Sequence, residues 1–165
     1  MKDRRTAVLV AVAVVAGIVV AAVGLATRGS SKPKRVLQID EANGRVGQVV
    51  LDETRDNVLG ALGNPREVGY APHQSLVYPH ITVEFRNGRV VAIETDDPAA
   101  RTNQAVSVGD PISAARAAYR KAADCVPNSP DKTAKHPHCR IKVPAGWLLV
   151  TGDPIKSLTV EARTS

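Results

Sequence analysis

The chain has 165 residues and a mass of 17.5 kDa, with 44% hydrophobic and 23% charged residues. This length allows one domain or two very small ones, and the composition excludes a wholly disordered chain. The net charge of +6 belongs to residues 1–35, which hold seven Lys or Arg and one acidic residue, whereas residues 36–165 are balanced. A neutral domain lacks the basic surface that binds a phosphate backbone, so we expect no nucleic-acid partner.

An apolar segment near the N-terminus has the length of a membrane span. Residues 7–26 form an uncharged run in which more than half of the side chains are Val, Leu or Ile, with basic residues on both sides. As a helix, this run is about 30 Å long, which matches the hydrocarbon core of a bilayer. Because the backbone in lipid must satisfy its own hydrogen bonds, we expect a helix despite the many β-branched valines.

The sequence therefore predicts a cytoplasmic tail over residues 1–6 and a transmembrane anchor over 7–27, in a single-pass protein of the cell membrane. Residues 28–45 are polar and basic and contain Gly and Pro, which is typical of a flexible linker. We expect the domain after this linker to be extracytoplasmic. The alternative is a signal peptide cleaved near Ala26, which would give a secreted protein.

Two segments of the remaining chain show the same order of predicted elements. Residues 54–63 begin with an N-cap threonine and end with glycine, which predicts a helix. An Asn87-Gly88 turn between two alternating segments then predicts a β-hairpin. Later, Asp110 is a predicted N-cap, and residues 112–119 are helical by propensity. Further strands are predicted over residues 139–143, 147–150 and 158–162.

The two predicted helices superimpose when the sequence is shifted so that Leu51 meets Val108. The fold is therefore predicted to be α+β, with two units, residues 46–102 and 103–165, each made of a helix and antiparallel strands. One short helix over two or three strands buries too little apolar surface to be stable alone. We expect the two units to share one antiparallel sheet with both helices on one face, as a helix-over-sheet layer.

Short motifs in both units resemble a repeat unit of small secreted bacterial proteins. The motifs are LDETRDNVLGALGNP at residues 51–65, an Asn-Gly-Arg-Val hairpin at residues 87–90 and a second opening at residues 108–119. The family includes the β-lactamase inhibitory proteins and the small lipoprotein of the outer-membrane assembly machine. Asp52 departs from the usual glycine, and the sequence has no lipid-acceptor cysteine. The resemblance, over residues 46–162, implies helix-over-sheet units, no enzymatic activity and a concave sheet that binds another protein.

Two cysteines, Cys125 and Cys139, are separated by a short segment that contains several prolines. An even number of cysteines in an exported domain predicts a disulfide, which for such a loop contributes about 3 kcal/mol. The first alternative is a metal site, because His136 and His138 lie beside Cys139 and all three are zinc ligand types. The second is a pair of free thiols. The His-Pro-His-Cys spacing fits no standard zinc finger, so we favour the disulfide and predict neither a metal nor a cofactor.

Candidate binding residues lie in a Pro-rich segment between the first helix and the hairpin. This predicted recognition loop contains Tyr70, His73 and Tyr78, and Trp147 is a further candidate if its side chain is exposed. The sequence has no nucleophile elbow, phosphate loop or dinucleotide fingerprint. We therefore assign no catalytic residue and expect no enzyme.

Three functions are compatible with these features. The first is a membrane-anchored, extracytoplasmic, non-enzymatic protein-interaction module of a bacterial cell envelope, with an envelope protein as partner. The second is a domain that binds a small ligand or the cell wall. The third is a small metal-dependent hydrolase that uses His136 and His138.

The disulfide hypothesis predicts how the thiols react in intact cells. Cys125 and Cys139 should resist maleimide labelling until a reductant is added, because oxidised sulfurs do not alkylate. Mass spectrometry of the labelled protein measures this. Ready labelling of both cysteines before reduction would contradict both the disulfide and the extracytoplasmic location.

Overall fold

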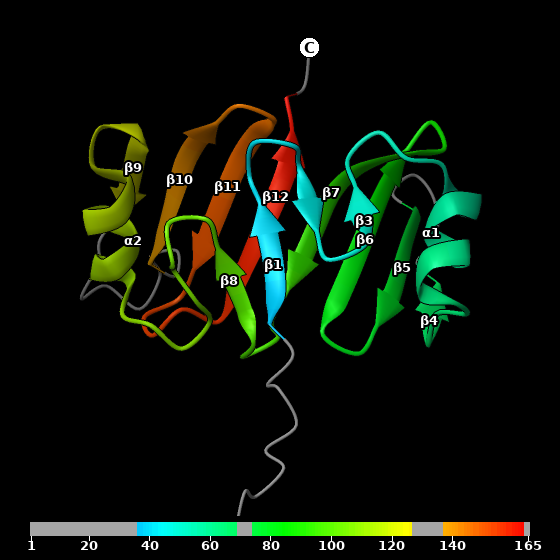
Figure 1. Cartoon of the computed structure of the whole chain (residues 1–165), viewed down its shortest axis with the longest axis horizontal. Helices are drawn as coiled ribbons and strands as arrows, with labels where there is room; N and C mark the ends of the chain where they lie inside the picture. The colour runs from blue at the N-terminus through cyan, green and yellow to red at the C-terminus, as the bar shows by residue number, and fades with distance from the viewer. Residues whose placement is uncertain (1–35, 69–73, 127–136, 164–165) are drawn as a thin grey trace, which may run out of the picture. The chain divides into compact units, whose positions relative to one another are not determined.

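The computed structural model describes residues 36–68, 74–126 and 137–163, which belong to one unit. The described residues form twelve strands, two short α-helices and one 3-10 turn (Figure 1). None of the described helices is long and apolar enough to cross a bilayer. The predicted tail, anchor and cleavage site, over residues 1–27, lie outside the described residues.

The larger of two sheets has eight antiparallel strands in the order β4-β5-β6-β7-β12-β11-β10-β9. Its first half is β4 (Glu67–Val68), β5 (Gln74–Tyr78), β6 (Ile81–Arg86) and β7 (Arg89–Thr95). Its second half is β9 (Ala123–Val126), β10 (His138–Val143), β11 (Gly146–Thr151) and β12 (Ser157–Ala162). The halves join where β7 pairs with β12 and Ile93 lies opposite Val160. The sheet is thus two consecutive meanders joined edge to edge.

The smaller sheet has the order β3-β2-β1-β8, with strands β1 (Leu37–Asp40), β2 (Arg45–Val46), β3 (Val49–Val50) and β8 (Ala100–Thr102). Strand β1 pairs antiparallel with β2 and parallel with β8. Figure 1 shows this sheet in front of the middle of the larger sheet, with helix α1 (Arg55–Leu62) at one end and helix α2 (Ile112–Tyr119) at the other. A 3-10 turn, η1 (Arg120–Ala122), follows α2. The smaller sheet and both helices therefore cover one face of the larger sheet.

The hydrophobic core fills the space between these layers. The smaller sheet and the helices contribute the fully buried side chains of Ile39, Val46, Val49, Val58 and Ala115. The larger sheet contributes Val83, Ile93, Cys139, Ile141, Leu148, Val150, Leu158 and Val160. Most of these core side chains are β-branched, as is typical of residues that pack on a pleated sheet.

Local signals in the sequence predicted both helices and the hairpin correctly. Helix α1 begins at residue 55 and α2 at residue 112, which is the same offset that brings Leu51 onto Val108. The Thr54 hydroxyl accepts a hydrogen bond from the Asn57 amide at 3.4 Å, as an N-cap does. Asn87 and Gly88 have φ values of 52° and 73°, which is the left-handed geometry of a type I′ turn.

The cap of the second helix differs from the prediction. Pro111, not Asp110, occupies the N-cap position of α2. The Asp110 carboxylate instead accepts a hydrogen bond from the Ser107 amide at 2.8 Å. Asp153, in the turn between β11 and β12, accepts from the Ile112 amide at 3.1 Å. The start of α2 is thus capped from another part of the chain, which a local sequence pattern does not reveal.

The predicted α+β class with two helix-over-sheet units is wrong. The structure is mostly β, with 48% strand and only two short helices in the part of the chain that it describes. A second sheet, not the helices alone, provides the cover. Three of its strands come from residues 37–50, so the linker predicted over residues 28–45 extends too far and includes β1.

The disulfide between Cys125 and Cys139 is confirmed. The two residues lie directly opposite each other on β9 and β10, so the bond fastens an edge strand of the larger sheet to its neighbour. Disulfides persist in oxidising compartments, and this one is typical of an extracytoplasmic domain.

The alternation on β11 predicts unequal effects of two neighbouring leucines. Leu148→Ala should lower the free energy of unfolding by about 2–5 kcal/mol, because Leu148 is fully buried and its loss leaves a cavity. Leu149→Ala should cost less than about 1.5 kcal/mol, since Leu149 is half-buried on the other face. Chemical denaturation followed by fluorescence of the single tryptophan measures both. Equal losses would contradict this assignment of faces.

Candidate functional site

The face of the larger sheet that points away from the smaller sheet is the candidate site. Successive residues of a strand point to opposite faces. Because Leu148 and Val150 are in the core, Trp147 and Leu149 lie on the other side. The registers of the strands extend this side to Thr82, Glu84, Ala92, Glu94, Asp124, Arg140, Lys142, Thr159 and Glu161. We call it the uncovered face, because no described helix or strand packs on it.

Trp147 is the largest side chain of the uncovered face and is half-buried. Its cross-strand partners are Lys142 on β10 and Glu161 on β12. The Arg140 guanidinium carbon lies 4.2 Å from the centroid of the Trp147 ring, which is a cation–π contact. With Leu149 two positions further on, this makes an apolar strip with charged neighbours on both sides. Tryptophan and arginine are the residue types most enriched at energetically important contacts between proteins.

A hollow of about 390 Å³ lies on the uncovered face near the β5–β6 turn. Val77, Thr82 and Glu94 line its sheet side. At its rim, His80 Nδ1 lies 2.8 Å from Asp96 Oδ1, and the two side chains are 57% and 62% exposed. A polar contact so exposed contributes little to stability, so both side chains are available to a partner.

The part of the predicted recognition loop that the structure describes belongs to a strand and not to a loop. Residues 74–78 form strand β5, and Tyr78 is buried in the core with 8% of its surface exposed. Its hydroxyl donates to the Gly63 carbonyl at 3.1 Å, and burial raises the pKa of this phenol. Tyr78 is therefore a core residue, which corrects its place in a recognition loop. Tyr70 and His73 lie outside the described residues, and Trp147 is on the opposite face from Tyr78.

Sequence reasoning found Trp147 but missed its neighbours. Arg140 and Lys142 alternate with apolar residues along β10, and Trp147 and Leu149 do the same along β11. This period of two indicates which side chains share a face. The pairing of β10 with β11 then brings the two sets together.

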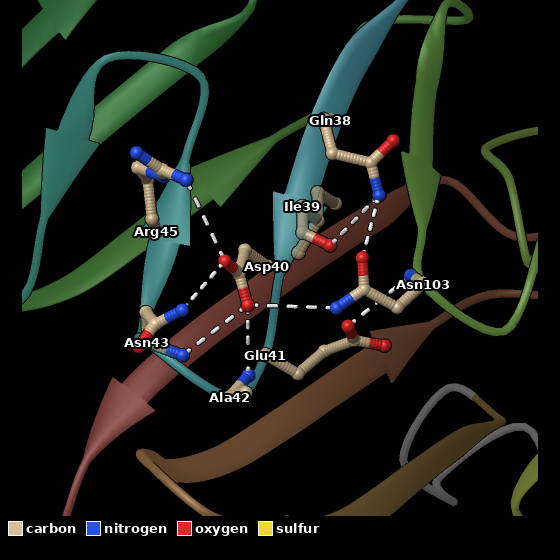
Figure 2. Close-up of polar contacts among 8 residues, drawn as sticks. All are labelled: Gln38, Ile39, Asp40, Glu41, Ala42, Asn43, Arg45 and Asn103. Carbon is tan, nitrogen blue, oxygen red and sulfur yellow. Dashed lines mark hydrogen bonds and ion pairs between the residues drawn. The ribbon is translucent and has the colours of Figure 1, made fainter.

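A cluster of polar side chains around Asp40 closes the turn between β1 and β2 (Figure 2). Asp40 Oδ1 accepts hydrogen bonds from the Ala42 and Asn43 amides at 3.2 and 3.3 Å, and Oδ2 accepts from Asn43 Nδ2 at 2.8 Å. Arg45 Nη2 lies 3.6 Å from the same Oδ2. The hydrogen bond from the Asn43 side chain is the main reason that the pKa of Asp40 is lowered.

The same cluster reaches the end of β8 through Asn103. Asn103 Nδ2 donates to Asp40 Oδ1 at 3.5 Å, and Gln38 Nε2 donates to Asn103 Oδ1 at 2.7 Å. Both carboxylate oxygens of Asp40 are thus occupied by neighbours within the fold, as Figure 2 shows. We interpret this cluster as structural rather than as a ligand site.

Glu41, the next residue, turns into the protein and is only 4% exposed. One carboxylate oxygen accepts from the Asn103 amide at 3.1 Å, and the other accepts from the Tyr119 hydroxyl on α2. The Glu41 carbonyl also accepts from the Ala145 amide at 3.4 Å. A buried carboxylate is costly unless it is hydrogen-bonded, and here the bonds join the end of β1 to three other parts of the fold.

Within the residues that the structure describes, no three His, Cys, Asp or Glu side chains are grouped to hold a metal ion. Of the residues in the metal hypothesis, Cys125 and Cys139 are joined as a disulfide. His138 lies on β10, and His136 lies outside the described residues.

Comparisons with known proteins bear on the fold alone. No protein-family model and no curated protein matches the chain. A solved extracellular protein of Bacillus anthracis that contains an SCP domain is similar over 68% of this chain, with 11% identity and a TM-score of 0.51. This chain covers 44% of that protein, which is less than half of its length. The uncharacterized protein yfeY of Escherichia coli has 10% identity and a TM-score of 0.43, with 77% of this chain and 99% of that one covered. Neither description names an inhibitory protein or a small lipoprotein, so that resemblance stays a prediction.

The contact between Tyr119 and Glu41 predicts a loss of stability at alkaline pH. Burial, and then the hydrogen bond to Glu41, raise the pKa of Tyr119 well above its ordinary value. The folded state therefore holds the phenolic proton more tightly than the unfolded state does. The resulting stabilisation is complete below about pH 10 and is lost as the pH rises from there towards the folded-state pKa. Urea denaturation at several pH values measures this loss.

Tyr119→Phe is the matched variant for this pH dependence. This substitution should lower the free energy of unfolding by about 1–3 kcal/mol at neutral pH, because Glu41 loses a hydrogen-bond partner inside the fold. Above about pH 10 its stability should fall less steeply than that of the wild type. Burial also raises the pKa of Tyr78, so the stability of the double variant with Tyr78→Phe should depend even less on pH in this range. If the stability of Tyr119→Phe alone fell as steeply with pH as that of the wild type, Tyr119 would not be the source of the pH dependence.

Proposed function

We propose that this protein is a non-enzymatic protein-interaction module of a bacterial cell envelope, and that residues 7–27 anchor it to the cell membrane with its domain on the outer side. The observation that carries the proposal is the uncovered face with its half-buried Trp147. One face of the larger sheet is covered by a second sheet and two helices. The opposite face carries an aromatic side chain where alternation in a solvated sheet usually places polar residues.

The arrangement around Trp147 is that of a small interaction centre. Trp147 and Leu149 supply apolar area that a partner would remove from water. Lys142 and Glu161, their charged neighbours, would form the rim and fix the orientation of the partner. Arg140 is already held against the indole ring, so its ordering costs little on binding. An envelope protein with a matching apolar pocket and charged rim is the partner we expect.

The location supports the same function. The disulfide between β9 and β10 is suited to an oxidising compartment. The uncharged run of residues 7–26 has the length of a bilayer span. Basic residues flank it on both sides, so the disulfide, rather than the flanking charges, favours the orientation with the domain outside. A domain tethered in this way meets other proteins at the membrane surface.

Site-specific crosslinking in cells tests the proposal. A photoreactive amino acid in place of Lys142 should give an adduct with one envelope protein, because Lys142 borders Trp147 on the uncovered face. The same amino acid in place of Arg116, which is exposed on α2 in the other layer, is the matched control and should give none. Capture of the full-length protein and mass spectrometry identify the adduct.

Trp147→Ala then tests whether the indole is the anchor. It should abolish the adduct at position 142 and weaken binding of the purified partner by about 30-fold or more, as expected for a central aromatic residue. Arg116→Ala should leave both unchanged. An adduct that persists in the Trp147→Ala protein would contradict this use of the face. Retention on purified peptidoglycan, with no protein captured, would instead favour the wall-binding alternative.

A further inference from the structure

A second hollow on the uncovered face, of about 530 Å³, carries charges of both signs, of which the proposed protein interaction uses only Glu161. It lies between the ends of β6, β7 and β12, away from the first hollow. Its lining includes two glutamates and three arginines, namely Glu84, Glu161, Arg86, Arg89 and Arg163. Its volume is within the range of small-ligand sites.

The floor of this hollow is the small side chain of Ala92. In the registers of the sheet, Ala92 lies opposite Glu84 on one side and opposite Glu161 on the other. Neighbouring strands are about 4.8 Å apart, so the two glutamates stand roughly 10 Å from each other with only a methyl group between them. This leaves room for a group of atoms between two carboxylates.

The arginines form a second row beside the glutamates. Arg86 and Arg163 each follow one of the two glutamates beside Ala92 by two positions, which along a strand is a step of about 7 Å. Arg89 is the direct cross-strand partner of Arg86. Two like charges in such positions destabilise a hairpin, and an anion between them would relieve the repulsion.

Two of the arginines are held in place by the backbone. Arg89 Nη1 donates to the Asp52 carbonyl at 2.9 Å, and Arg163 Nη2 donates to the Val143 carbonyl at 3.4 Å. A guanidinium has five N–H donors, so each retains donors for a ligand. Their positions are thus set before a ligand arrives, which lowers the entropy cost of binding.

The charges of the hollow do not neutralise one another. Across the described ranges, the ion pairs join Asp40 with Arg45 and His80 with Asp96, and none joins an arginine of the hollow to Glu84 or Glu161. A simple anion such as phosphate would meet the two carboxylates, and a simple cation would meet the three guanidinium groups. Only a ligand that carries both charges satisfies both rows.

We propose that this hollow binds a zwitterionic ligand, either an amino acid or a short peptide. Its carboxylate accepts hydrogen bonds from Arg86 and Arg89, whose forked donors match a carboxylate in pairs. Its ammonium group lies over Ala92 between Glu84 and Glu161. The inference goes beyond the proposed protein interaction. The two sites share Glu161, the cross-strand partner of Trp147. Glu84 and Arg86, which the test below changes, are on β6, separated by two strands from Trp147 on β11.

Calorimetric titration of the full-length protein in detergent micelles tests this site. The probes are L-alanyl-L-alanine, its N-acetyl derivative, its C-terminal amide, free L-alanine and inorganic phosphate. The free dipeptide should bind saturably, and blocking either end should weaken binding by about tenfold or more, because each block removes one charge. If L-alanine binds as tightly as the dipeptide, the ligand is an amino acid, and if it binds much more weakly, the ligand is a peptide end.

Two substitutions with matched controls locate the binding. Arg86→Gln should weaken binding of the free dipeptide by about tenfold. Lys142→Gln, which removes the same charge elsewhere on the uncovered face, should leave this binding unchanged. Glu84→Gln should remove the preference for the free over the N-acetylated dipeptide, whereas Glu94→Gln, at the first hollow, should keep it. Circular dichroism checks that each variant is folded.

Several results would overturn the proposal. These are no saturable binding of any probe at millimolar concentration, binding of phosphate as tight as that of the dipeptide, and equal effects of Arg86→Gln and Lys142→Gln. The outcome is separable from that of the protein interaction. Trp147→Ala should keep dipeptide binding, and Arg86→Gln should keep the adduct at position 142.

Discussion

The parallel pairing of β1 with β8 is the interaction on which the two-layer structure depends. It places Leu37 opposite Ala100 and Ile39 opposite Thr102, and so joins segments that are far apart in the sequence. The very short strands β2 and β3 cannot make a stable sheet without it. Directly after β1, the buried carboxylate of Glu41 bonds to Tyr119 of α2 and to the loop after β8. The smaller sheet is therefore bonded to segments from both halves of the chain.

A single irregularity on β7 determines what the uncovered face presents. The register between β6 and β7 shifts at Glu84 and Phe85, so β7 has one additional residue, Val91. This bulge lets Val90 and Ile93 both point into the core although an odd number of positions separates them. It also turns Ala92 outward between two glutamates. The same backbone feature thus preserves the core and creates the hollow beside it.

The sequence reveals elements whose signals are local and misses those whose partners are distant. Helix α1, the Asn87-Gly88 hairpin and the C-terminal strands have a cap, a turn or alternation close by in the chain, and α2 has a local run of residues that favour a helix. Strands β1 and β8 have no such signal, because they are too short to show periodicity and their pairing spans the first helix and hairpin. The prolines around Tyr78 predict a loop, although its strand pairs with β6. At the candidate site, Trp147 is visible as a rare residue type, but its contact with Arg140 requires the register of β10 and β11.

The position of β1 has a mechanical consequence. A pull on the chain ahead of Leu37 would load β1 along its own axis, while β2 and β8 hold it from both sides. Under such shear the hydrogen bonds of a ladder bear the load together, whereas an edge strand pulled sideways loses them one at a time. Resistance to force is a matter of the unfolding rate rather than of equilibrium stability. A domain tethered through residue 36 would therefore transmit tension from a bound partner to its tether while its fold remains closed.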